Sequence, residues 1–77
     1  MDKLLLLLSE IRPEIDFVNE KKLIDNGVLD SFDIITIISE INAVFNVSIS
    51  VADIEADNLN SVEAMYKLIE QLQEQNN

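Results

Sequence analysis

The sequence predicts an all-α fold, a small four-helix bundle in which one helix is short. The apolar residues make up 48% of the 77 residues and are mostly Leu, Ile and Val. The chain holds 1 Gly and 1 Pro, so few of its residues favour turns. Apolar side chains also recur at helical spacing in three separate segments. At this length we expect one domain over residues 1–77.

The first predicted helix begins near Asp2, its expected N-cap, and ends at Ile11 or Arg12. Pro13 sets this end, because the residue before a proline avoids the α region. One face of this helix collects apolar residues at spacings of four and three, namely Leu4, Leu8 and Ile11.

Residues 14–30 show no sustained period and are predicted to form a loop. Asp25, Asn26 and Gly27 are a turn signal within it. A loop this long in a small domain is unusual and is often functional or packed by its own side chains. Its scattered apolar residues predict that it lies across the bundle, and they are Ile15, Phe17, Leu23, Ile24, Val28 and Leu29.

The strongest predicted helix runs from Ser31 to Phe45, with Asn46 as the residue that ends it. The polar interruptions fit a period of 3.6 better than the period of 2 of a strand. Its core face should consist of Ile34, Ile37, Ile38, Ile41 and Phe45.

The second half of the chain predicts a short helix and then a long one. Ser50 should cap a brief turn from Val51 to Ile54 or Ala56. The last helix is predicted from about residue 61 to residue 73, with Asn60 as its cap and Glu63 completing a capping box. Its apolar stripe is Val62, Met65, Tyr66, Ile69 and Leu72, and residues 73–77 should fray.

Composition excludes several classes of function. The chain has no Cys and no His, so it lacks disulfides, the commonest metal ligands and the commonest general base, and we expect neither an enzyme nor a metal site. A net charge of −10 repels nucleic acid and anionic lipid; the acidic residues either attract basic protein surfaces or only keep the domain soluble. The apolar run of residues 4–8 is far too short to span a membrane, and no small-residue cleavage site of a signal peptide follows it. These features predict a cytoplasmic monomer without nucleic-acid or membrane partners.

The candidate site lies where the long loop meets the strongest helix. Asp30 and Ser31 stand at this helix start, and Asp33 adds negative charge to its first turn. An Asp-Ser pair before an apolar run is often no more than an N-cap, with either residue in that role.

The segment from Leu29 to Phe32 resembles the Asp-Ser-Leu signature of acyl and peptidyl carrier proteins, with Phe in place of the usual Leu. The resemblance extends over nearly the whole chain in length, acidic charge and helix order. It implies a freestanding carrier whose Ser31 bears 4′-phosphopantetheine as a phosphodiester, with Asp30 as a recognition residue. The implied partners are a phosphopantetheinyl transferase, a loading enzyme that supplies acyl or aminoacyl groups, and enzymes that use the thioester.

The resemblance also implies a partner-binding face on the second helix and the loop before it. We expect this face to include Phe32, Asp33, Ile35, Thr36 and Ser39. Alternatively, Phe32 and Ile35 could tuck under the long loop. The low charge of this helix differs from the Glu-rich second helix of fatty-acid carriers, which favours a dedicated pathway. Residues 27–31 are similar to D-alanyl carriers of teichoic acid modification; a non-covalent acidic interaction module with a carrier-like fold is a further alternative.

Overall fold

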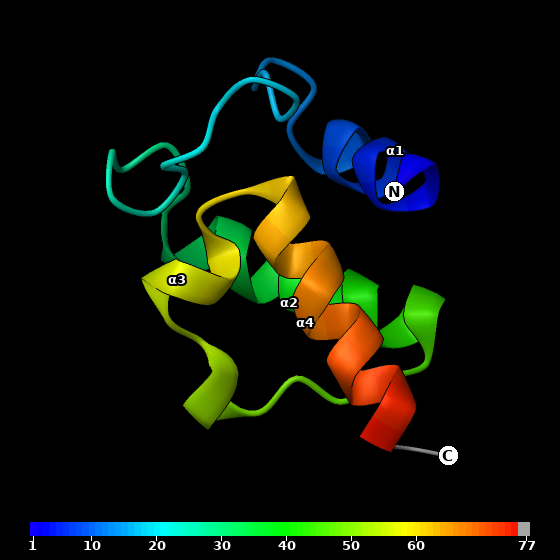
Figure 1. Cartoon of the computed structure of the whole chain (residues 1–77). Helices are drawn as coiled ribbons and strands as arrows, with labels where there is room; N and C mark the ends of the chain where they lie inside the picture. The colour runs from blue at the N-terminus through cyan, green and yellow to red at the C-terminus, as the bar shows by residue number, and fades with distance from the viewer. Residues whose placement is uncertain (76–77) are drawn as a thin grey trace.

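The computed structural model describes residues 1–75 (Figure 1). Over these residues it contains no strand, and the predicted all-α class with one short helix is confirmed. The elements in chain order are α1 (Asp2–Ile11), α2 (Ser31–Phe45), the 3₁₀ helix η1 (Val51–Asp53), α3 (Ala56–Leu59) and α4 (Val62–Gln75).

The core is shared by the helices and the long loop. Helix α1 packs against α2 and α4, and α3 packs against α4. The predicted stripes supply much of this core, and Leu7 and Leu68 are also buried. Six residues of the predicted stripes are only partly buried, namely Ile11, Ile34, Ile38, Phe45, Tyr66 and Leu72. The fully buried stripe residues are Leu4, Leu8, Ile37, Ile41, Val62, Met65 and Ile69.

The segment between α1 and α2 lies across the bundle as predicted, and in Figure 1 it is the blue-to-green trace that leads from α1 to α2. Three of its apolar side chains, those of Phe17, Leu23 and Leu29, are buried in the core. Burying these side chains removes apolar surface from water, which offsets the entropy lost in ordering a long loop. The loop is therefore part of the fold that positions Ser31.

The structure tests the predicted caps at the end of α2 and at the start of α1. Asn46 adopts a left-handed conformation with φ 55° after α2, which confirms it as the residue that ends this helix. The predicted N-cap of α1 is wrong by one residue. Met1 holds that position, because the Leu5 amide donates to its carbonyl, and Asp2 is already helical.

The brief turn predicted after Ser50 is present as η1, which has Ser50 as its N-cap but ends at Asp53, before the predicted Ile54 or Ala56. The short α-helix α3 follows it as a separate element that was not predicted. Burial explains the difference, because Val51 is 85% exposed whereas Leu59 of α3 is buried in the core. The segment from Val51 to Ile54 thus lacks a buried apolar face that would hold a longer helix.

The start of α4 also differs from the prediction. Ser61 is the capping residue, since its Oγ accepts from the Ala64 amide at 3.1 Å. Asn60 instead bonds the long loop, and Glu63 forms an ion pair with Lys21. Helix α4 continues to Gln75, so residues 73–75 are helical and the predicted fraying is wrong for them. Residues 76–77 of the expected tail lie outside the described residues.

Candidate functional site

Ser31 is the first residue of α2 and is exposed to solvent. The residue two positions earlier, Leu29, is buried in the core. The chain therefore emerges from the core at Leu29 and places Ser31 on the surface within two residues. A buried anchor followed at once by a helix start gives this serine a defined position.

Asp30 is the N-cap of α2, which decides between the two capping roles left open above. Its Oδ1 accepts from the Asp33 amide at 2.9 Å, and Asp33 Oδ2 accepts from the Asp30 amide at 3.2 Å. This reciprocal capping box satisfies amides that α2 leaves without an intrahelical partner. Both capping hydrogen bonds join Asp30 and Asp33, and the Ser31 hydroxyl takes no part in them.

Arg12 joins the end of α1 to this helix start, a link that sequence reasoning missed. Its guanidinium donates to Asp33 Oδ2 and, through Nε, to Glu14 Oε1 at 2.6 Å. The hydrogen bond to Glu14 is the main cause that raises the pKa of Arg12 and lowers the pKa of Glu14. The only sequence signal was a single base just after the first helix of an acidic chain.

The chemistry that this site can do alone is limited. Both aspartate carboxylates of the first turn accept from main-chain amides, and Asp33 also binds Arg12. The chain has no His or Cys to act as base or thiol. In the described residues, no group of three or more acidic side chains is placed to hold a metal ion. The site thus presents a serine hydroxyl, and the chain holds no His or Cys that could activate it.

A family model described as "phosphopantetheine attachment site" matches residues 3–69. The chain belongs to this family. It is a carrier that is not itself an enzyme, and its cofactor is 4′-phosphopantetheine, which a phosphopantetheinyl transferase attaches covalently. Searches among curated proteins and among solved structures found no significant match.

The residues of the helix start fit this cofactor. A phosphodiester needs a hydroxyl that another protein can reach, and Ser31 is exposed and outside the capping box of the carrier. The adjoining helix N-terminus carries positive partial charge, which favours a phosphate group there. No helix within residues 1–75 of the carrier is long and apolar enough to cross a bilayer.

The surface beside Ser31 is apolar in part. Phe32 is 82% exposed and Ile35 is 66% exposed, so neither tucks under the long loop. Thr36 and Ser39 are exposed on the same helix. Asp33 differs from these four, because its side chain is 13% exposed and is bound by Arg12. The expected partner face is therefore accessible, with Asp33 mostly shielded.

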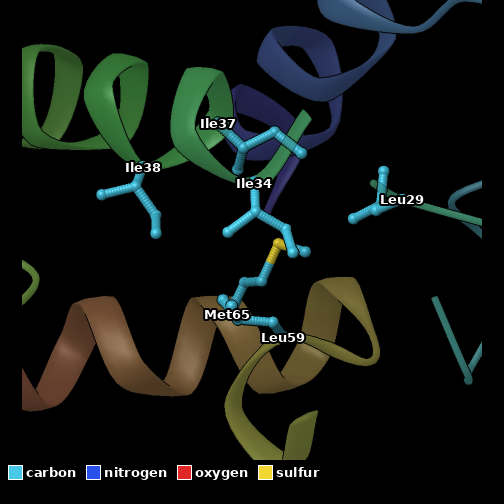
Figure 2. Close-up of a pocket in the computed structure, with 6 residues that line it drawn as sticks. All are labelled: Leu29, Ile34, Ile37, Ile38, Leu59 and Met65. Atoms are coloured by element: carbon cyan, nitrogen blue, oxygen red, sulfur yellow. The ribbon is translucent and has the colours of Figure 1, made fainter. Parts of the chain in front are cut away.

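A small apolar gap lies between α2, α3 and α4 of the carrier (Figure 2). In Figure 2, Ile34 of α2 and Met65 of α4 point toward one another across it. The space is about 160 Å³ including its open mouth, but the side chains leave no room for a water molecule inside. The lining residues are Leu29, Ile34, Ile37, Ile38, Leu59 and Met65.

Proposed function

We propose that Ser31 is the attachment point of the phosphopantetheine arm and that this carrier presents a small or polar acyl or aminoacyl group as a thioester. The observation that carries the proposal is the exposed Ser31 hydroxyl at the capped start of α2, inside the family match. The thioester needs a thiol that the chain itself lacks, and the arm supplies it.

Attachment would proceed by transfer from coenzyme A. The Ser31 oxygen forms a bond to the phosphorus that bears the pantetheine, and the pyrophosphate bond of coenzyme A breaks. Adenosine 3′,5′-bisphosphate leaves, and the hydroxyl proton passes to a base of the transferase. The carrier contributes position through the Asp30 cap, and Asp30 also contributes a negative charge that the transferase recognises.

The partner surface of the carrier comprises Phe32, Ile35, Thr36 and Ser39, with Asp33 at its edge. Exposed aromatic and aliphatic side chains are unusual on a charged surface and commonly mark contact sites. The acidic charge of the remainder of the chain would steer basic surfaces of partner enzymes toward it. Transferase and acyl-handling enzymes would share this face, because all must reach Ser31.

The cargo is proposed to stay outside the bundle. The gap beside Leu29 and Met65 has no room for a water molecule, so a long acyl chain would have to displace packed side chains. A small or polar group needs no such space. The D-alanyl group fits this description, and so do other aminoacyl groups of a dedicated biosynthetic pathway; the low charge of α2 argues against a housekeeping fatty-acid role.

Intact mass spectrometry tests the attachment point. The carrier is incubated with coenzyme A and a broad-specificity transferase, beside Ser31→Ala and the control Ser48→Ala, an exposed serine outside the partner surface. We expect a gain of one phosphopantetheine in the wild type and in Ser48→Ala, and none in Ser31→Ala. A gain in Ser31→Ala would contradict the assignment of Ser31.

Thermal melts test the cargo. The holo protein is loaded with an acetyl or an octanoyl group and compared with the unloaded form. Burying a chain would stabilise the fold by about 0.8 kcal/mol per CH₂ group. We expect equal melting temperatures for the two loaded forms, and a clear rise for octanoyl alone would contradict an external cargo.

A further inference from the structure

Asn60 occupies the junction between α3 and α4. Its backbone amide donates to the Ala56 carbonyl at 2.8 Å, and α3 ends there. The next residue, Ser61, caps α4. The backbone of Asn60 is thus fixed by two helices. Its side chain takes no part in either helix and turns to the long loop.

Asn60 binds three consecutive loop residues, an arrangement that we call the Asn60 clasp. Its carbonyl oxygen accepts from the Leu23 amide at 2.9 Å. Its side-chain Oδ1 accepts from the amides of Ile24 at 2.9 Å and Asp25 at 3.0 Å. Its Nδ2 donates to Asp25 Oδ2 at 3.0 Å. The Asn60 side chain therefore accepts two hydrogen bonds and donates one, all with the same short segment. Asp25 of this segment lies 35 positions before Asn60 in the chain.

The segment that Asn60 binds leads directly to α2, which begins at Ser31. The Leu23 carbonyl accepts from the amides of Val28 at 3.0 Å and Leu29 at 3.1 Å. Gly27 allows the tight return, with φ +67° and an amide that donates to the Ile24 carbonyl at 3.0 Å. Residues 23–29 are thus one hydrogen-bonded turn that the clasp holds at its first three residues. Asp30, the cap of α2, follows at its end.

We propose that Asn60 is a positioning residue for the modification of Ser31. Through the clasp it holds the turn of residues 23–29 against the α3–α4 junction, which fixes the approach to Ser31 that a transferase must dock on. The inference rests on the proposed function of Ser31. A turn released from the clasp has to be ordered again during docking, so its loss weakens binding more than it slows the chemical step.

The interaction of Asn60 with Asp25 gives a specific test by exchange of the two side chains. Asn60→Asp alone brings a second carboxylate against that of Asp25, and the like charges repel. Asn60→Asp combined with Asp25→Asn restores one amide facing one carboxylate with the direction of donation reversed. The double variant also keeps an acceptor for the amides of Ile24 and Asp25 and leaves the net charge unchanged.

The matched control is Asn58→Ala. Asn58 Nδ2 donates to the Asp53 carbonyl at 2.9 Å, within the same part of the chain. Among the described residues, the Asn58 side chain makes no hydrogen bond to the long loop. Amide hydrogen exchange on the unmodified protein should show faster exchange at Ile24 and Asp25 in Asn60→Ala. Asn58→Ala should leave exchange at these two amides unchanged, because the clasp is intact there.

Steady-state kinetics of phosphopantetheine transfer then measure the positioning role, with each chain at a temperature where it is fully folded. We expect Asn60→Ala to raise the KM for the carrier about tenfold, equivalent to about 1.4 kcal/mol, with kcat nearly unchanged. Asn58→Ala should keep the wild-type KM. Asn60→Asp should be impaired, and the Asn60→Asp, Asp25→Asn double variant should recover most of the loss.

Two results would overturn the role of Asn60 alone. One is an equal KM for wild type, Asn60→Ala and Asn58→Ala; the other is a double variant as impaired as Asn60→Asp. If Asn60→Ala fails to fold, the comparison of Asn60→Asp with the double variant decides the question. A wild-type chain that accepts no phosphopantetheine would instead contradict the carrier site itself, and the role of Asn60 would fall with it.

Discussion

The Arg12 guanidinium binds the carboxylate of Asp33, 21 residues further along the chain. The same carboxylate oxygen accepts from the Asp30 amide, which belongs to the cap of α2. One oxygen atom therefore connects the end of α1, the cap and the first turn of α2. Ser31 lies within this connection without taking part in its bonds.

The Arg12→Ala variant should loosen the start of α2, because Asp33 keeps only its bond from the Asp30 amide. We expect faster hydrogen exchange at the Asp30 amide and a lower urea midpoint at low salt. The difference from wild type should shrink toward 1 M salt, where charge interactions are screened within about 3 Å.

Lys22→Ala is the matched control for Arg12, since it removes the same charge but lies outside the three ion pairs of the described residues. It should not change exchange at Asp30. Equal effects of the two variants at every salt concentration would show that net charge alone is responsible.

The Asp30→Ala variant should destabilise the carrier by about 1 kcal/mol, since loss of an N-cap side chain costs about 0.5–2 kcal/mol. Asp30→Asn should keep most of this stability, because Asn caps helices as well as Asp does. Urea unfolding measures both. If the transferase also recognises the charge of Asp30, Asp30→Asn should accept phosphopantetheine slowly despite its stability. Transfer of phosphopantetheine at the wild-type rate would restrict Asp30 to a capping role.

The long loop should behave as part of the core. Leu23 is fully buried, so Leu23→Ala should cost about 2–5 kcal/mol in the free energy of unfolding. Val18 is exposed in the same loop, and Val18→Ala should stay within about 0.5 kcal/mol of wild type. Urea unfolding at pH 7 distinguishes them; a mild effect of Leu23→Ala would mean that the loop is only loosely attached.

The ion pair between Lys21 and Glu63 should contribute a small, pH-dependent stability. The hydrogen bond from Lys21 is the main cause that lowers the pKa of Glu63 from its ordinary 4.5. A lowered folded-state pKa stabilises the fold above the unfolded value, and the contribution is lost as the pH falls through the folded value. Because both side chains are about half exposed, we expect less than about 0.5 kcal/mol.

The measurement is the difference in urea midpoint between wild type and Glu63→Gln from pH 7 to pH 3. It should be present above about pH 4.5 and disappear at the acid end of the range. Glu70→Gln, on an exposed position of the same helix and outside the ion pairs, controls for net charge. A Glu63→Gln difference that persists at pH 3 would assign the effect to something other than this ion pair.

Helices α1, α2 and α4 could be predicted from the sequence because each buries a periodic apolar face. Residues 31–45 were assigned with both ends correct, since Asp30 and Asn46 are strong local signals. Long-range polar contacts could not be predicted in this way. Asn60 looked like a local cap, but its side chain bonds residues 35 and 36 positions away, and no periodicity encodes that. The Arg12–Asp33 pair was missed for the same reason.

The exposure of Phe32 and Ile35 was also left open by the sequence. Both lie off the core face of α2, and only the path of the long loop decides whether they are covered. The loop packs Phe17, Leu23 and Leu29 into the core and leaves these two side chains in solvent. Their exposure therefore depends on tertiary packing that local propensity does not specify.

The most direct test of the account is to locate the modification in the holo protein by fragmentation mass spectrometry. The carrier is modified with coenzyme A and a transferase, and the fragment ions on either side of each serine are compared. We predict that the mass of phosphopantetheine first appears between Asp30 and Phe32, which places it on Ser31. The same mass on another serine, or no modification under conditions that modify a known carrier, would contradict the account.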